Sequence, residues 1–455
     1  MKEKMKSGLL AALILISLVQ SYFLIYRMPG ADSVVNSEAG YVQAEDIGPR
    51  SSIESLIFPD KMIVHLANSR HTIFYPSSTE YTTIYDTIRK ASFGQFRRLS
   101  LQSMDWNQIR NDEGVELMFG SGIPVSLLER SLKINPDSLF EGDAVNRIWL
   151  YTAPDDRTVR AFFFSASGDV VYEATDMDLR TEDISRSALL GANGVSYQYT
   201  STGYYLPRTA ITAPNVTLTL DSLTTEQMQR NLFFDPGATR NINEENGIEI
   251  YTDSKRSLQV DTRQRWMIYT DPTAPTSGTN NVSDNVLSAV DFVNQHGGWP
   301  GMYTLSMGTS SSDKNGFVFR QYYRSYPIME TDAFKFGYMR LGVERNTVST
   351  YERSMLYLAA NPTQTETTSA ASSSGAASAN GAAGQGNATT QLRQLPAGQQ
   401  LLQMIKTQIP VGKQIVDLSP VYRPSLGNGV VVLTPVWMAK LQDGSTQFLT
   451  ASASQ

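Results

Sequence analysis

The longest apolar stretch of the chain lies at its N-terminus, from Gly8 to Tyr26, and contains no charged residue. At a rise of about 1.5 Å per residue, a helix of this length spans about 28 Å, close to the roughly 30 Å hydrocarbon core of a bilayer. Three lysines precede the stretch and one arginine follows it closely. The pattern predicts a transmembrane helix over 8–26, with residues 1–7 in the cytoplasm and the bulk of the chain outside it.

A cleaved secretory signal is the alternative interpretation. The apolar core of such a signal is about 7–15 residues long and is followed by a small-residue cleavage site. The stretch here is longer, ends with three aromatic residues, and is followed by Pro29, Gly30 and Ala31 without an Ala-x-Ala pattern. We therefore expect the segment to be retained, which makes the chain a single-pass protein of the cell membrane with an extracytoplasmic bulk.

The rest of the chain alternates short strand-like and helix-like patterns, which predicts an α+β fold of antiparallel sheets packed with helices. Residues 27–52 are rich in Gly, Ser, Asp, Glu and Pro, and predict a stalk or linker. We expect an N-terminal α+β domain at 53–180, a central helix-plus-sheet domain at 187–275 and a C-terminal helix-plus-sheet domain at 282–450.

The N-terminal domain is expected to combine a hairpin, two helices and a meander. Its predicted elements are the hairpin strands 61–66 and 71–75, a helix over 79–98, a buried strand at 114–120, a helix after Pro124, and alternating strands over 147–174.

In the other two domains, a helix leads into an antiparallel meander three times, over 223–270, 286–358 and 401–449. This recurrence is a sign of duplicated modules. The helix at 284–295 is expected to end at Gly297–Gly298, because glycine adopts the left-handed conformation that follows many helix C-termini.

A low-complexity stretch at 361–391 interrupts the C-terminal domain. It contains no aromatic and no branched aliphatic residue. Since it has nothing to bury, we expect a disordered loop.

Composition narrows the possible functions. The sequence has no cysteine, so it has neither disulfides nor cysteine-ligated metals, and this suits an exported protein. Its net charge is −6, and Lys and Arg form no cluster beyond the N-terminal lysines. Because nucleic-acid binding depends on such clusters, we exclude nucleic acid as a partner.

The three histidines are the first candidates for chemistry. His65 and His71 lie on the two strands of the predicted hairpin and are expected to face each other. A zinc site would need a third ligand, which the flanking sequence does not offer, so a structural role is favoured. His296 lies at a helix C-terminus, where the helix dipole favours a cation, and we expect it to cap the helix.

No sequence motif indicates catalysis. The G-x-S-x-G elbow, S-x-x-K with K-T-G, the P-loop and G-x-G-x-x-G are all absent. Gly120–Ser121–Gly122 is expected to be a turn, and the carboxylate pairs at 155–156, 182–183 and 244–245 are expected in solvated loops. We predict no catalytic residue, no cofactor and no metal, and therefore no enzyme.

The predicted membrane helix carries a candidate interaction face. Small residues allow helices to approach closely in lipid, and a glutamine seeks a hydrogen bond to a neighbouring helix, worth about 0.5–2 kcal/mol. The face consists of Gly8, Ala12, Ile16, Ser17, Gln20 and Ser21. The alternative is that the small residues are spaced by chance and that Gln20 extends toward the membrane surface.

Five segments of the chain resemble the YycH family of accessory regulators of the WalK (YycG) sensor histidine kinase in Gram-positive bacteria. They are SIESLIFPDKMIVH (52–65), GVELMFGSGIPVSLL (114–128), IEIYTDSKRSLQVD (248–261), FVNQHGGWPGMYTL (292–305) and GFVFRQYYRSYPIM (316–329). These are packing motifs, so they point to a fold and carry no catalytic residue. The stretch at 361–391 departs from the family's pattern.

The resemblance implies a non-enzymatic membrane regulator that acts with a sister protein, YycI, of similar topology. It also implies contacts with the WalK/YycG kinase in the membrane and outside it, and a role in two-component signalling for cell-wall homeostasis. No catalytic residues are carried over.

Two other functions remain open on the residues alone. An anchored binding module for a cell-wall or small-molecule ligand needs a concave aromatic pocket, for which Trp299, Tyr303, Tyr322 and Tyr323 are candidates. An envelope hydrolase needs a cleft with a serine or a carboxylate pair of raised pKa.

Overall fold

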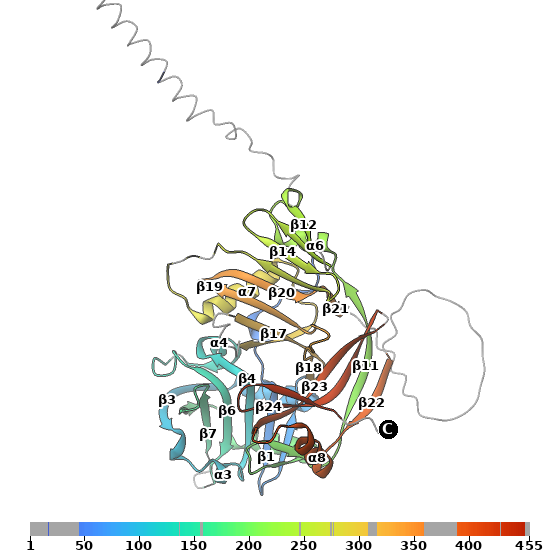
Figure 1. Ribbon diagram of the computed structural model, residues 1–455. Coiled ribbons are helices and arrows are strands. Elements are labelled where there is room, and N and C mark those ends of the chain that lie inside the picture. The colour runs from blue at the N-terminus through green and yellow to red at the C-terminus, as the bar shows by residue number, and fades with distance from the viewer. Residues whose placement is uncertain are drawn as a thin grey trace, which may run out of the picture. The chain divides into compact units, whose positions relative to one another are not determined.

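The computed structural model describes Ser17 and residues 45–135, 137–154, 158–244, 247–273, 275, 277–307, 316–358, 389–427 and 429–450. Those from Glu45 onward belong to one compact unit with three sheets, and the predicted α+β class is confirmed (Figure 1). The predicted tail 1–7 and membrane helix 8–26, with its interaction face, lie outside the described residues apart from Ser17. No helix in the described part of the chain is long and apolar enough to cross a membrane.

Sheet one comprises ten strands among the described residues, antiparallel except for one pair at its end. Their order is β10 (Tyr205–Pro207), β9 (Ser196–Tyr199), β2 (His71–Phe74), β1 (Lys61–Leu66), β4 (Glu113–Pro124), β6 (Ala144–Thr152), β7 (Val159–Ser165), β8 (Val170–Met177), β3 (Ser92–Ser100) and β5 (Lys133–Ile134). The helices of this part of the chain are η1 (Ile53–Ser55), α2 (Thr79–Lys90), η2 (Leu101–Ser103), α3 (Trp106–Ile109), α4 (Val125–Ser131) and α5 (Thr181–Ala192).

The predicted hairpin of β1 and β2 is confirmed, but the helix predicted over 79–98 ends at Lys90 and is followed by β3. Phe93 and Phe96 are three residues apart, a spacing typical of a helix. In β3 they enter the same core, and Gln95 between them has a left-handed φ of 51°, which interrupts the two-residue alternation of the strand while the register with β8 stays constant. A local backbone irregularity thus imitates helical spacing.

Both faces of sheet one are covered, which explains the nearly continuous apolar runs in β6 and β7. On one face, Leu150 and Phe163 join the main core with side chains of α2, α4 and α5. On the other face, Trp149 and Phe162 form a smaller core with side chains of η2 and α3. The alternation of apolar and polar residues expected for these strands is therefore replaced by continuous apolar runs, because neither face of the sheet meets water.

Helix α5 (residues 181–192) begins between the predicted N-terminal and central domains and continues into the predicted central domain, at a place where no helix is predicted. Its Ile184 packs in the main core. Its last turn contains Gly191, which lowers helix propensity. The packing requires this glycine, because a Cβ there would lie 2.9 Å from the side chain of Val64 in β1.

The other two sheets share strands from distant parts of the chain. Sheet two contains β21 (Leu356–Leu358), β11 (Ile211–Ser222), β24 (Val430–Leu441) and β23 (Ile415–Gly427), with β22 (Thr389–Leu395) on β11, β25 (Thr446–Leu449) on β24, and helix α8 (Gly398–Gln408) following β22. Sheet three has the order β12 (Arg240–Glu244), β13 (Ile248–Thr252), β14 (Ser257–Asp261), β15 (Trp266–Thr270), β20 (Thr347–Ser354), β19 (Tyr338–Glu344), β17 (Gly316–Tyr323) and β16 (Met302–Met307), with β18 (Tyr326–Pro327) on β17.

Sheet three is built from two meanders that meet at their last strands, β15 and β20. Helix α6 (Thr225–Leu232) and the short η3 (Pro236–Ala238) precede the first meander, and α7 (Val282–Gln295) precedes the second. This symmetric order agrees with the duplication that the sequence suggests for 223–270 and 286–358.

Strand pairing departs from the predicted domain boundaries. Strands β9 and β10, expected in the central domain at 187–275, belong to sheet one, and β11 pairs with strands from the end of the chain. Local alternation identifies a strand but says nothing about its partner. Residues 389–391 of the predicted loop pair with β11, and the rest of that loop lies outside the described residues.

Two neighbouring residues connect the sheets. Lys61 in β1 forms an ion pair with Asp417 in β23 and donates a hydrogen bond to Ser419 (3.0 Å). Asp60 accepts a hydrogen bond of 2.8 Å from the hydroxyl of Tyr322 in β17. Residues 60 and 61 therefore link sheet one to sheets three and two.

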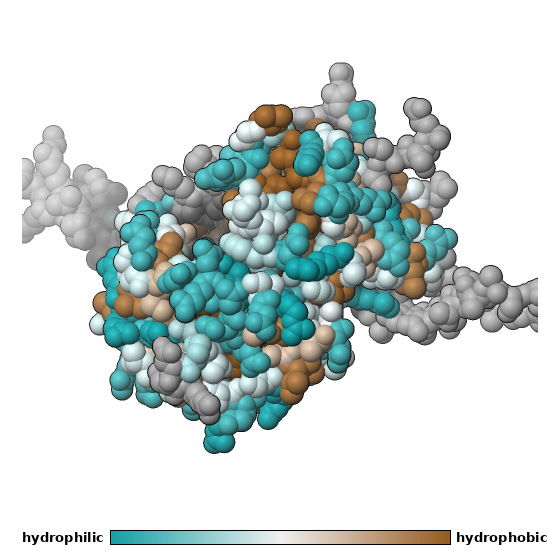
Figure 2. All heavy atoms as spheres, turned by 90° about the horizontal axis from the view of Figure 1, so that it is seen from below, coloured by the Kyte–Doolittle hydropathy of each residue, from teal (hydrophilic) through white to brown (hydrophobic). Residues whose placement is uncertain are grey.

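Seen from below, the surface of the folded unit carries apolar side chains in several separate groups among polar ones (Figure 2). Most of the buried large apolar residues are gathered in three cores. This face has the polar covering expected of a surface in contact with water.

Residues 45–52, the described part of the predicted stalk, are fixed to helices of the C-terminal half; we call them the strap. Glu45 exchanges two hydrogen bonds with Asn231 in α6, from its N–H to Oδ1 (2.8 Å) and from Nδ2 to its carbonyl (3.1 Å). Its carboxylate accepts from Gln227 (2.7 Å) and pairs with Arg230 (2.6 Å).

The strap continues along the end of α7. The N–H groups of Ile47 and Gly48 donate to the carbonyl of Gly297 at 2.7 and 2.9 Å. Ser51 and Asn294 exchange two hydrogen bonds of 2.9 Å between the Ser51 backbone and the Asn294 amide. The segment predicted as a linker is therefore part of the fold, at least from residue 45.

Replacing Gly48 by alanine tests this packing. A Cβ there would lie 2.6 Å from the nitrogen of Pro300 and closer still to the carbonyl of Trp299, so the strap must shift. We expect a loss of about 1–3 kcal/mol of unfolding free energy, as for overpacked sites, and faster protease cleavage within 45–52. Gly142→Ala is the control, since a Cβ there meets no atom within 4 Å. Equal stability and cleavage of the two variants would contradict the packing.

Candidate functional site

The two histidines of the hairpin face each other, as the sequence predicts. Their Nδ1 atoms are 2.9 Å apart, and the Nε2 atom of His65 lies 2.9 Å from a carboxylate oxygen of Glu116 in β4. The three side chains form a hydrogen-bonded chain, because Glu116 and His71 contact opposite nitrogens of His65. They do not converge on one point, as zinc ligands must.

Two arginines and a tyrosine extend this buried chain. Tyr205 donates a hydrogen bond to Glu116 (3.3 Å) and accepts one from Nε of Arg110 (3.1 Å). Arg147 lies 3.7 Å from the second oxygen of Glu116. Glu116 is thus the shared anion of a polar network within the apolar interior on the second face of sheet one.

The network shifts the pKa values of Glu116 and His71. Burial raises the pKa of a carboxyl, but the hydrogen bond from His65 and the positive groups of Arg147 and Arg110 outweigh it and lower the pKa of Glu116 to about 2. Burial is the main cause that lowers the pKa of His71 to about 3, helped by nearby positive groups. Near neutral pH, Glu116 is ionised and His71 is neutral.

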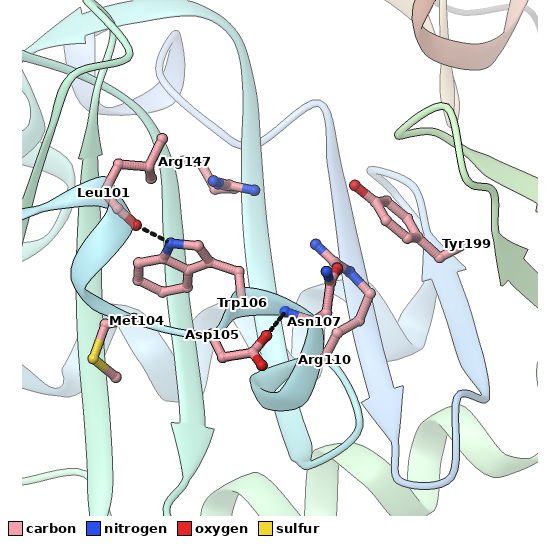
Figure 3. A pocket seen from close by; sticks show the side chains of 8 residues that line it. All are labelled: Leu101, Met104, Asp105, Trp106, Asn107, Arg110, Arg147 and Tyr199. Atoms are coloured by element: carbon pink, nitrogen blue, oxygen red, sulfur yellow. Dashed lines mark hydrogen bonds between the residues drawn. The ribbon is translucent and has the colours of Figure 1, made fainter.

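A pocket of about 490 Å³ opens next to this network. Its lining residues come from η2, α3 and the residues that cap them, and from β6 and β9: Leu101, Met104, Asp105, Trp106, Asn107, Arg110, Arg147 and Tyr199 (Figure 3). The two arginines therefore connect the pocket to the buried Glu116.

Several of the lining groups are held by internal hydrogen bonds. Asp105 accepts hydrogen bonds of 3.1 Å from the N–H groups of Asn107 and Gln108, which caps α3. The indole N–H of Trp106 donates to the carbonyl of Leu101 (2.6 Å). The pocket wall is thus fixed before any ligand arrives.

The aromatic residues proposed for a binding pocket lie elsewhere. Trp299, Tyr303 and Tyr322 are buried in the main core or at its edge, and the indole N–H of Trp299 donates to Asn294 (2.9 Å). Tyr323 packs edge-on against Tyr422. Their role is structural packing.

The remaining sequence candidates are also structural. His296 is the C-cap of α7, as predicted, with Nδ1 2.6 Å from the carbonyl of Phe292; its pKa is lowered by burial, so the cation expected from the helix dipole is disfavoured. Gly120–Ser121–Gly122 lies at an irregularity within β4 and is not a turn. Asp183 caps the first turn of α5 by accepting from the N–H of Arg180 (3.2 Å).

Sequence comparison gives the family. Residues 3–187 match the N-terminal domain of YycH protein and residues 201–449 match its C-terminal domain. The chain belongs to the YycH family. The predicted family is thereby confirmed, and the five packing segments lie within the two matched regions.

Individual YycH proteins are distant in sequence but similar in fold. A protein of Bacillus subtilis (strain 168), named as the two-component system WalR/WalK regulatory protein YycH, is 18% identical over 384 residues, which cover 81% of this chain and 83% of that protein. The crystal structure of YycH from Bacillus subtilis matches with a TM-score of 0.67 and 16% identity, over 89% of this chain and 99% of that one. The family's fold therefore extends over most of the described residues.

Acidification tests the neutral state of His71. Its pKa in the folded protein, about 3, lies below the ordinary value of 6.5, so the unfolded chain binds more protons between these values. The stabilisation is full above about pH 6.5 and is lost as the pH falls toward 3. From pH 7 to 5, we expect the unfolding free energy to fall by about 2 kcal/mol on this account.

The measurement is denaturant unfolding at pH 7 and pH 5. His71→Gln removes the titrating group, so its stability should change less between the two pH values than that of the natural chain. An equal or larger change in the variant would show that His71 is not held neutral.

Proposed function

We propose that this chain is a membrane-anchored, non-enzymatic regulator of a WalR/WalK-type two-component system. The observation that carries the proposal is membership of the YycH family, together with the name of the Bacillus subtilis relative, a two-component system WalR/WalK regulatory protein. The partners proposed are a WalK/YycG-type sensor histidine kinase and a YycI-type sister protein.

In this proposal, the helix predicted over 8–26 is the anchor. The N-terminus is cytoplasmic and the folded unit is extracytoplasmic, in contact with the kinase and the sister protein there. In the bilayer, the face of Gly8, Ala12, Ile16, Ser17, Gln20 and Ser21 packs against the membrane helices of the kinase. The support for this part is the uncharged stretch and its flanking charges.

Helix packing of this kind is strong enough to regulate a kinase. A regulator shifts a two-state equilibrium only through contacts that differ between the states. A coupling of about 1–3 kcal/mol changes the output about 5–150-fold, so a few helix contacts suffice.

The strap supports a link between the anchor and the folded unit. A free linker would absorb a movement of either part. Residues 45–52 are instead hydrogen-bonded to α6 and to the end of α7, so only residues 27–44 separate the predicted anchor from the fold. A movement of the folded unit on partner binding is therefore passed to the chain at Glu45, with eighteen residues between it and the predicted membrane helix.

Substitutions in the membrane helix test the proposal. Ala12→Ile places a bulky side chain on the proposed face, so we expect weaker co-purification with the kinase, or altered transcription of its target genes. Ala11→Ile is the matched control, since the neighbouring position points about 100° away around the helix. If both variants matched the natural chain in association and in transcription, the membrane face would be wrong.

A second function, binding of a small molecule, is favoured by one observation, the arginine-lined pocket beside α3. This pocket lies at a different place from the aromatic binding site that the sequence suggested around Trp299. The two functions are compatible, because a bound ligand is a possible input to a regulator.

A further inference from the structure

The arginine-lined pocket has features of a built anion site. Arg110 is 93% buried, and among the described residues no carboxylate lies within 4.0 Å of it. Burying a cation without an anion is costly, so such a group usually has a partner. Its hydrogen bonds use Nε, to Tyr205, and Nη1, to Asn107 (3.0 Å), and no hydrogen bond to a described residue uses Nη2.

Aromatic rings hold both guanidinium groups in place. The Arg110 guanidinium lies over the ring of Tyr199 at 3.7 Å, and that of Arg147 lies over Phe164 at 3.6 Å. Stacking fixes the plane of a guanidinium but leaves the N–H groups along its edge available for an oxyanion. Figure 3 shows the two groups in the same pocket, between Trp106 and Tyr199.

The charges of the pocket select among anions. Arg147 lies beside the buried carboxylate of Glu116, and Arg110 reaches it through Tyr205, so these three charged groups together carry one net positive charge. Asp105 at the pocket wall brings the formal sum to zero, but its carboxylate accepts hydrogen bonds from the N–H groups of Asn107 and Gln108. A carboxylate ligand adds one negative charge and meets the two guanidiniums directly, whereas a phosphate, which carries about −1.5 to −2 at pH 7, meets more repulsion from Asp105.

Apolar and aromatic side chains make up the rest of the wall. Leu101, Met104 and the indole of Trp106 line it beside the arginines. A small inorganic anion would leave this apolar surface exposed to water. An anion that carries a flat apolar group, such as an aromatic ring, would cover it.

We propose that this pocket binds a small monocarboxylate with an aromatic or apolar body. The carboxylate lies between Arg110 and Arg147, and the body packs against Trp106. The proposal stands on the described residues and does not depend on the regulatory function proposed above.

Binding of benzoate to the full chain in mild detergent tests this site. Saturation-transfer NMR or tryptophan fluorescence gives the affinity, since Trp106 lines the pocket. Benzoate should bind, and its neutral isostere benzamide should bind at least about tenfold more weakly, because it lacks the charge that the guanidiniums recognise. Equal affinity for both would overturn the proposal, and so would the absence of benzoate binding.

Arginine variants locate the binding. Arg147→Gln should weaken benzoate binding about tenfold or more and leave benzamide binding unchanged. Arg110→Gln should do the same if it folds, and Arg147, which is more exposed, keeps the test valid if it does not. The matched control is Arg186→Gln in α5, whose arginine is on the surface beside Asp183. Equal benzoate affinity in Arg147→Gln and Arg186→Gln would contradict the site.

Inorganic phosphate distinguishes the proposed ligand class from a general oxyanion. Phosphate should bind more weakly than benzoate, since it offers no body to Trp106 and is repelled by Asp105. If phosphate bound as tightly as benzoate and with the same dependence on Arg147, the monocarboxylate assignment would be wrong.

Discussion

The strap, residues 45–52, is the contact through which the N-terminal part of the chain is attached to the folded unit. Whatever the first 44 residues do, the chain enters its fold through residues 45–52, and these are held by side chains of α6 and α7 and by the backbone of the Gly297–Gly298 turn. Both glycines have left-handed φ values, and a Cβ on either would collide with the strap, at Ile47 or at Gly48. The turn that ends α7 therefore also binds the strap. This double role explains why two glycines follow His296 in the motif HGGWPG.

A second constraint is the burial of sheet one on both faces. Strands in such a sheet cannot turn polar side chains to water, so buried polar groups are stabilised mainly by partners within the protein. His65, His71 and Glu116 satisfy one another in this way, with Glu116 ionised and His71 neutral. Arg110 differs, because its Nη2 atom makes no hydrogen bond to a described residue and no carboxylate among the described residues lies within 4.0 Å of it. The unused edge of this buried guanidinium marks the pocket beside α3 as the place where a ligand belongs.

Features set by neighbouring residues are predictable from the sequence. The hairpin that brings His65 opposite His71, the glycine stop of α7 and the paired meanders of sheet three all follow local patterns. Features set by tertiary pairing are not. The left-handed residue Gln95 gave β3 an apolar spacing typical of a helix, and β9 and β10 joined sheet one across the expected domain boundary. The pocket could not be predicted from the sequence for the same reason. Its residues Arg110 (after α3), Arg147 (in β6) and Tyr199 (in β9) come from segments far apart in the chain.

Hydrogen exchange of the backbone amides in residues 45–52 is the most direct test of the strap. In the folded chain, the N–H groups of Ile47 and Gly48 donate to Gly297, and that of Ser51 donates to Asn294. We predict that these three amide protons exchange with solvent as slowly as those in the last turn of α7. Exchange at the rate of an unstructured peptide would mean that the fold begins after the strap, and the proposed connection between anchor and folded unit would be lost.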